Sequence, residues 1–432
     1  MMPTPPKWPR GPLNELHQAA MRGSAERVNS VLTRGVVNIN QGDPTGRTPL
    51  MCAARKGCPR VVGILLNKGA TMSIACDMGF TALLISAQNG HVAVTTTLLT
   101  AGADLEQADK QGFRVLHMAS SNGHSEVMKI LMNAGANVDC RGFGGETPLY
   151  LAASKGHVGT MRLLLDAKAN PLLTAVGGDS ATQLPLDIAA TGGQSDAVHQ
   201  LIQQLGIEVC GGASGGVHAL QAAAQEQHLG IMATLVLAGV VDTGGALISA
   251  AGFGGAESVK FLLEQQDKEK PALKAAYANY CDELGRTPMS ACILGSDRSC
   301  SPRVVRMLVD AGADTTTMFR LVNTRGKVVL NEMPLVVTNF ILSEKNVRGQ
   351  PATEKQLRRV EAIRRLLLQV EAVHAVSWRW PSNVSSVVRA VEGTRKMNTT
   401  SISPKIILPI MKRQGGAHRV ILAAFFRQST KL

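Results

Sequence analysis

The sequence predicts an all-α solenoid, in which short helical repeats stack side by side along the chain. Three observations lead to this fold class. A tripeptide anchor recurs every 33 residues in the first half of the chain. Small residues, a glycine and an apolar pair follow each anchor at constant offsets. Aromatic residues make up only 3% of the 432 residues, which suits a thin core of aliphatic side chains between stacked layers.

The anchors define the repeat and its number. An early copy lies at Leu16-His17, and weaker copies follow at residues 184–186, 219–220, 246–247 and 287–289. These positions predict an array of about nine units over residues 13–318. The four most regular anchors follow one another in steps of 33 residues: Thr48–Leu50, Thr81–Leu83, Arg114–Leu116 and Thr147–Leu149.

The residues that follow each anchor predict two helices per unit. A small pair such as Ala53-Ala54 lets the first helix pack closely on its neighbour, and the anchor proline suits the first turn of that helix. A glycine such as Gly57 then ends the helix, because the cap there needs a left-handed conformation. An apolar pair such as Leu65-Leu66 lies on the second helix. One unit cannot bury this pair alone, so the stack is the folding unit.

This pattern resembles the ankyrin-repeat family. The period, the Thr-Pro-Leu-His-like anchor and the Gly-Ala that closes many units match the family's turn followed by two helices. The resemblance covers residues 13–318, and the best unit, residues 43–75, carries every feature in register. It implies short β-hairpin loops between helix pairs. It also implies that other proteins bind at the hairpin tips and on the exposed face of the first helices.

The later units depart from the pattern. Gln227 replaces the glycine of unit seven, and a polar insertion at residues 265–280 separates units eight and nine. Unit nine also contains an extra loop at residues 295–299. We therefore expect the frame to be most regular in units two to five.

Residues 319–380 are predicted to form a degenerate capping repeat that ends in an amphipathic helix. A short coiled-coil seam for dimerisation is the alternative, but the pattern spans only two heptads. The helix is expected over residues 354–378, because apolar residues recur there at spacings of three and four: Leu357, Val360, Ile363, Leu367 and Val370.

The net charge of +13 is concentrated at one end of the chain. Residues 1–340 contain 28 basic and 27 acidic side chains, whereas residues 341–432 contain 17 and 5. Residues 381–432 are predicted to be a basic, mostly irregular tail. This tail could be a solubilising segment, could contact nucleic acid or anionic lipid, or could dock on the acidic middle of the array. That middle has no Lys or Arg between Lys168 and Lys260.

Several classes of protein are excluded or disfavoured. Residues 1–12 are rich in proline and predict a disordered tail rather than a secretory signal. The eight cysteines are too sparse for a disulfide scaffold and form no Cys-x-x-Cys pair. We expect a protein of the cytoplasm, with the nucleus as an alternative. We expect no membrane-spanning helix, because the sequence has no apolar run of the necessary length.

An enzymatic role is not expected, and neither is a metal ion or cofactor. His91, His124 and His157 are spaced by one repeat and occupy equivalent positions, which predicts a structural role. No catalytic combination of side chains stands apart from the repeat frame.

We therefore expect a monomeric scaffold or adaptor that binds other proteins. The alternative is association with nucleic acid or an anionic membrane through the basic tail. Phe80, Phe113 and Tyr150 are expected to form an exposed apolar stripe, although the rings could instead fold back on neighbouring hairpins. The candidate tip residues are Arg47, Met78, Phe80, Lys110, Phe113, Phe143 and Glu146. The candidate first-helix residues are Met51, Arg55, Leu84, Gln88, His117, Asn122, Tyr150 and Lys155.

Overall fold

The structure is a computed structural model, and the chain divides into two compact units, residues 1–368 and 369–432. Predictions for residues 1–12, the loop at 295–299 and the tail at 381–432 lie outside the described residues. Those residues are 15–35, 37–176, 182–210, 215–267, 271–294, 301–315, 319–322, 328–332, 334, 338, 346–347, 350–351 and 354–377.

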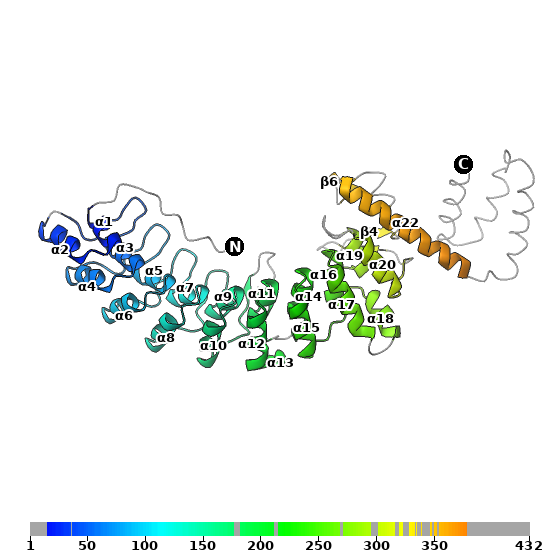
Figure 1. Ribbon diagram of the computed structural model, residues 1–432, viewed down its shortest axis with the longest axis horizontal. Helices are drawn as coiled ribbons and strands as arrows, with labels where there is room; N and C mark the ends of the chain where they lie inside the picture. The colour runs from blue at the N-terminus through cyan, green and yellow to red at the C-terminus, as the bar shows by residue number, and fades with distance from the viewer. Residues whose placement is uncertain are drawn as a thin grey trace, which may run out of the picture. The chain divides into compact units, whose positions relative to one another are not determined.

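Nine helix pairs make up most of the described part of the first unit (Figure 1). The first helix of each pair contacts the first helices of its neighbours, and the second helices contact one another in the same order. This two-layered row confirms the predicted all-α solenoid. The pairs are α1 (Glu15–Arg22) with α2 (Ala25–Thr33), α3 (Pro49–Lys56) with α4 (Pro59–Asn67), α5 (Ala82–Gln88) with α6 (Val92–Thr100), α7 (Val115–Ser121) with α8 (Ser125–Asn133), α9 (Pro148–Lys155) with α10 (Val158–Asp166), α11 (Pro185–Thr191) with α12 (Ser195–Leu205), α14 (Val217–Gln225) with α15 (Leu229–Leu237), α16 (Gly245–Gly252) with α17 (Ala256–Asp267), and α19 (Pro288–Leu294) with α20 (Pro302–Asp310).

The remaining elements lie between or after these pairs. The predicted insertion after α17 is partly helical, because residues 271–278 form a further helix. Three short antiparallel strand pairs occur among the described residues, and Ala175 faces Gln183 in the first of them. These elements are α13 (Ile207–Cys210), α18 (Pro271–Ala278), β1 (Ala175–Val176), β2 (Thr182–Gln183), β3 (Phe319–Val322), β4 (Val328–Glu332), β5 (Asn346–Val347), β6 (Gln350–Pro351) and α22 (Glu354–Ser377).

The core follows the repeat. Leu65, Leu98, Leu131 and Leu164 lie at equivalent positions of four second helices, and all four are fully buried. The small pairs of the first helices are also buried, as at Ala53 and Ala54. Each layer therefore buries its side chains against the next layer, which explains why few aromatic side chains are needed.

The anchors begin the first helices by capping them. The hydroxyls of Thr48, Thr81 and Thr147 accept hydrogen bonds from the backbone N–H three residues later. Arg114 has no such hydroxyl in its anchor. There the N–H of Arg114 donates to Nδ1 of His117 over 3.0 Å, so the helix start is held by a different side chain.

The ends of α3, α5 and α7 are each coupled to the next repeat through a histidine. The imidazole Nε2 atoms of His91, His124 and His157 donate to main-chain carbonyls of the preceding repeat, over 2.9 to 3.1 Å. The ring of His124 packs against Gly90, which has a φ of +73°. A Cβ atom at residue 90 would lie 2.6 Å from Nδ1 of His124. The glycine therefore provides both the left-handed cap and the space for the ring.

Helix α22 packs against the array through the face that the sequence predicts. Val360, Ile363 and Leu367 are buried in the same hydrophobic cluster as Val304 and Leu308 of α20. This burial favours the capping role over an exposed seam for dimerisation. None of the described helices is long and apolar enough to cross a membrane.

The contact between Gly90 and His124 can be tested by comparison with a second glycine. This glycine also has a positive φ, but no side chain packs against it. Gly102 has a φ of +87° and nothing within 4 Å of an added Cβ atom. We predict that Gly90→Ala lowers the free energy of unfolding by about 3 kcal/mol, from backbone strain and overpacking together. Gly102→Ala should cost only ~1 kcal/mol, from backbone strain alone. Urea denaturation followed by circular dichroism measures both; equal losses would contradict this account.

Candidate functional site

Loops between successive helix pairs form a row of five hairpin fingers: residues 43–47, 76–80, 109–113 and 142–146, and the β1–β2 hairpin. An aspartate closes two of them. The carboxylate of Asp43 accepts from the N–H groups of Thr45 and Arg47, and that of Asp109 accepts from Gln111 and Phe113. Such bonds fix a tight turn without a long strand ladder, so only the β1–β2 finger has paired strands among the described residues.

The five fingers are joined edge to edge by main-chain hydrogen bonds. The N–H of Asp77 donates to the carbonyl of Thr45, and the N–H of Lys110 donates to that of Met78. The same link continues from Phe143 to Gln111 and from Val176 to Gly144, over 3.0 and 2.8 Å. The tips therefore have fixed spacing relative to one another.

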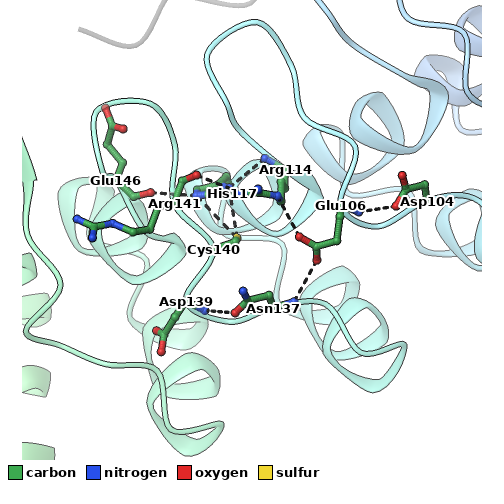
Figure 2. Close-up of polar contacts among 9 residues, drawn as sticks. All are labelled: Asp104, Glu106, Arg114, His117, Asn137, Asp139, Cys140, Arg141 and Glu146. Atoms are coloured by element: carbon green, nitrogen blue, oxygen red, sulfur yellow. Dashed lines mark hydrogen bonds and ion pairs between the residues drawn. The ribbon is translucent and has the colours of Figure 1, made fainter.

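A polar network at the base of the fingers centres on His117 (Figure 2). Its Nε2 atom donates to the carbonyl of Glu146 in the next finger over 3.0 Å, and its Nδ1 atom lies 3.5 Å from Sγ of Cys140. Burial lowers the pKa of His117 to about 4, and burial raises the pKa of the Cys140 thiol to about 12. Both groups are thus neutral at pH 7 and serve to hold the fingers.

Arg114 and Arg141 extend this network across three repeats. Nε of Arg114 pairs with the Glu106 carboxylate over 3.0 Å, and its Nη1 atom donates to the carbonyl of Arg141. Nη2 of Arg141 in turn donates to the carbonyl of Thr174 over 2.7 Å. Figure 2 shows Glu106 between Arg114 and the loop at Asn137, whose N–H donates to the same carboxylate. These bonds make the fingers one connected structure.

The predicted exposed stripe of Phe80, Phe113 and Tyr150 does not form. Phe113 and Tyr150 are buried, and Phe80 is half-buried against the core. The ring of Phe113 packs on that of His117, with centroids 5.3 Å apart. The Tyr150 hydroxyl donates to the Gln183 side chain of the β1–β2 finger. The aromatic side chains therefore fold back onto neighbouring fingers, as the alternative prediction had it.

Other candidates are also buried, for a common reason. Met51, Leu84 and His117 occupy the anchor's fourth position, which belongs to the core. Their prediction as exposed concave contacts is wrong. Arg47 is buried because its guanidinium pairs with the Asp43 carboxylate inside its own finger, and Glu146 is half-buried.

The remaining candidates are accessible and lie in two rows. Met78, Lys110 and Phe143 are exposed on three successive finger tips, and Phe143 is 82% exposed. Val176, which the sequence reasoning missed, continues this row and is 56% exposed. Its equivalent place on the fifth finger was the signal that could have found it. We call these four residues the tip row. The second row lies at the ends of first helices, where Arg55, Asn122 and Lys155 are exposed and Gln88 is half-buried.

No group of His, Cys, Asp and Glu side chains suited to a metal ion occurs among the residues that the structure describes. Exposed apolar and basic side chains stand on a connected row of fingers.

Comparison with known proteins identifies the repeats. Residues 16–109, 98–175 and 116–213 match the family model of ankyrin repeats, described as three copies. The chain is also similar to the E3 ubiquitin-protein ligase KEG of Arabidopsis thaliana, at 42% identity over 57 residues. The match covers 13% of this chain and 4% of that protein. The chain thus spans only a small fraction of the relative's length, and the similarity is confined to that short segment.

The depressed pKa of His117 predicts a pH-dependent stability. Between about pH 6.5 and pH 4 the unfolded chain binds a proton at this histidine and the folded chain does not, so the free energy of unfolding falls as pH falls. We predict that the free energy of unfolding of His117→Gln falls by on the order of 2 kcal/mol less than that of the wild type over this pH range. Val127→Ala, which also truncates a buried side chain, is the matched control and should keep the wild-type slope. Urea denaturation at several pH values gives both slopes, and identical slopes for His117→Gln and the wild type would refute the assignment.

Proposed function

We propose that this chain, in which residues 16–213 are ankyrin repeats, is a scaffold or adaptor that binds a partner protein on the tip row and the ends of its first helices. Ankyrin repeats are a protein–protein interaction module. The observation that carries the proposal is the exposure of Met78, Phe143 and Val176 on the fingers, where Phe143 and Val176 occupy equivalent positions one repeat apart. Neighbouring apolar side chains that a soluble array leaves in water are typical of an interface.

The linked fingers support tight binding. A partner that meets flexible loops must first order them, and that cost is subtracted from the binding free energy. Here the tips are already held by main-chain bonds between fingers and by the network around His117. The surface is thus pre-organised, and little ordering is needed when a partner binds.

The charges around the tip row indicate the chemistry of the partner. Lys110 lies between Met78 and Phe143, and Arg55, Lys56 and Lys155 are exposed at the ends of first helices. A partner with apolar side chains and nearby carboxylates would complement this surface. Such ion pairs at the rim contribute more to the rate of association and to specificity than to affinity.

A double substitution on the tip row tests the proposal. We predict that Met78→Ser with Phe143→Ser removes the specific partners that the wild-type chain captures from a cell lysate, measured by quantitative mass spectrometry. Loss of two apolar anchors should weaken binding by about 2–4 kcal/mol. At a low concentration of the chain, this loss should leave the partners uncaptured.

The matched control is Leu237→Ser, which removes a side chain that is 88% exposed on a second helix. This variant should retain the wild-type partners. Because all three positions are exposed, circular dichroism should report the same fold for every variant. Retention of the partners by the double variant, or their equal loss in the control, would contradict the proposed surface.

A further inference from the structure

Among the described residues the row of fingers ends with the β1–β2 finger: residues 207–210 of the next connection form α13, and the connection before the eighth helix pair is short. The loops before α5, α7 and α9 span residues 68–81, 101–114 and 134–147, and each carries a finger. The loop between α15 and α16 spans only residues 238–244, which is half that length. It connects the two helices directly and leaves no chain for a finger.

Tyrosines from the insertion hold this short loop in place. The carboxylate of Asp242 accepts from the N–H of Ala246 over 3.1 Å, which caps α16. The hydroxyl of Tyr277, on α18, donates to the same carboxylate over 2.6 Å. The ring of Tyr280 lies against Gly244, where a Cβ atom would collide with it. The insertion thus stabilises the loop, and its Tyr280 also lines the groove beside it.

A finger normally covers the fourth anchor position of the preceding repeat. His17 donates to the carbonyl of Arg47 in the next finger over 2.8 Å, and His117 does the same to that of Glu146. Gln221 occupies this position in α14. The short loop offers it no finger carbonyl, and its side chain lines a groove. A polar amide replaces the buried residues of the earlier repeats at the place where the covering chain is missing.

The groove has a volume of about 660 Å³, which lies within the range of ligand-binding pockets. Ile248 and Ser249 of α16 line it together with Phe253, which follows that helix, and so do Gln221 and Gln225 of α14. The finger of the last repeat, residues 282–286, also lines it and presents Leu284. Phe253 and Leu284 are 42% and 40% exposed, so the groove offers apolar contacts beside side-chain amides.

The charges at the groove are predominantly negative. Glu283 lines it, and Glu226 is exposed next to Gln225. The Arg286 guanidinium is paired with the Asp282 carboxylate over 2.7 Å. No Lys or Arg occurs between residues 168 and 260, so α14 and α16 bring no positive charge except that of histidine. An apolar segment with Lys or Arg side chains matches this surface.

We propose that an extended segment of a partner protein, with alternating apolar and basic side chains, occupies the place of the missing finger. A backbone carbonyl of the segment accepts from the Gln221 amide, as finger carbonyls accept from His17 and His117. An apolar side chain packs between Phe253 and Leu284, and a basic side chain pairs with Glu283. The inference rests on the proposed function as a binding protein but uses a surface separate from the tip row.

Fluorescence anisotropy with defined peptides tests the groove. The probe is a labelled synthetic peptide of about ten residues in which leucine and lysine alternate, a length suited to an extended segment in a groove. A peptide with glutamate in place of lysine is its control. The full chain should bind the lysine peptide saturably and at least about tenfold more tightly than the glutamate peptide. Absence of saturable binding, or equal affinity for both peptides, would overturn the proposal.

Substitutions in the chain locate the binding. Phe253→Ser and Gln221→Ala should each weaken binding of the lysine peptide by about fivefold or more, and Glu283→Lys should weaken it most at low salt. Leu284→Ser provides a second apolar test at an exposed finger position, should Phe253→Ser disturb the fold.

The Met78→Ser, Phe143→Ser variant is the matched control and should bind the lysine peptide like the wild type. Loss of peptide binding in that variant but not in Phe253→Ser would place the peptide on the tip row and overturn the groove, while leaving the proposed function standing. Self-association that Phe253→Ser abolishes, measured by sedimentation, would show instead that a second copy fills the groove.

Discussion

The packing of each repeat on the next is the constraint on which the rest of the structure depends. Leucines such as Leu98 and Leu131 face the neighbouring layer, and one helix pair cannot remove them from water alone. Histidine side chains also donate hydrogen bonds to carbonyls of the preceding repeat, and these bonds fix the orientation of one repeat on the next. Stability therefore arises between repeats, and the surface residues are free to differ along the array. A binding surface can change on such a frame without loss of the fold.

The helical frame was predictable from the sequence, whereas the exposed surface was only partly so. Period and spacing determine which residues face the next layer, so the anchors and Gly57 indicated the first helices correctly. Period and spacing do not show which loop covers a given side chain on the solvent side of the helices. Tyr150 looked like a concave contact, but the β1–β2 finger buries it through Gln183. Met78 and Phe143 are exposed at hairpin tips, and their role as partner contacts stays a prediction.

The later repeats illustrate the same limit. The insertion between units eight and nine read as a polar loop, yet Tyr277 is buried against Asp242. The polar composition of the insertion does not show that one of its tyrosines holds the loop before α16 in place. The short connection before α16 was visible as an irregular spacing between anchors. Its consequence, an uncovered Gln221, becomes apparent only when the neighbouring fingers are seen.

The tip row and the groove differ in what they demand of a ligand. At the tip row the fingers are joined by main-chain hydrogen bonds, so a partner adds contacts to a surface that is already ordered. At the groove the chain lacks the finger that precedes the first helix in repeats two to six. A ligand there gains by supplying the carbonyl that the short loop cannot offer. Hydrogen bonds to backbone atoms select for an extended conformation and not for sequence, so discrimination falls to Phe253, Leu284 and the acidic rim. The two surfaces can thus recognise different chemistry while sharing one stack of helices.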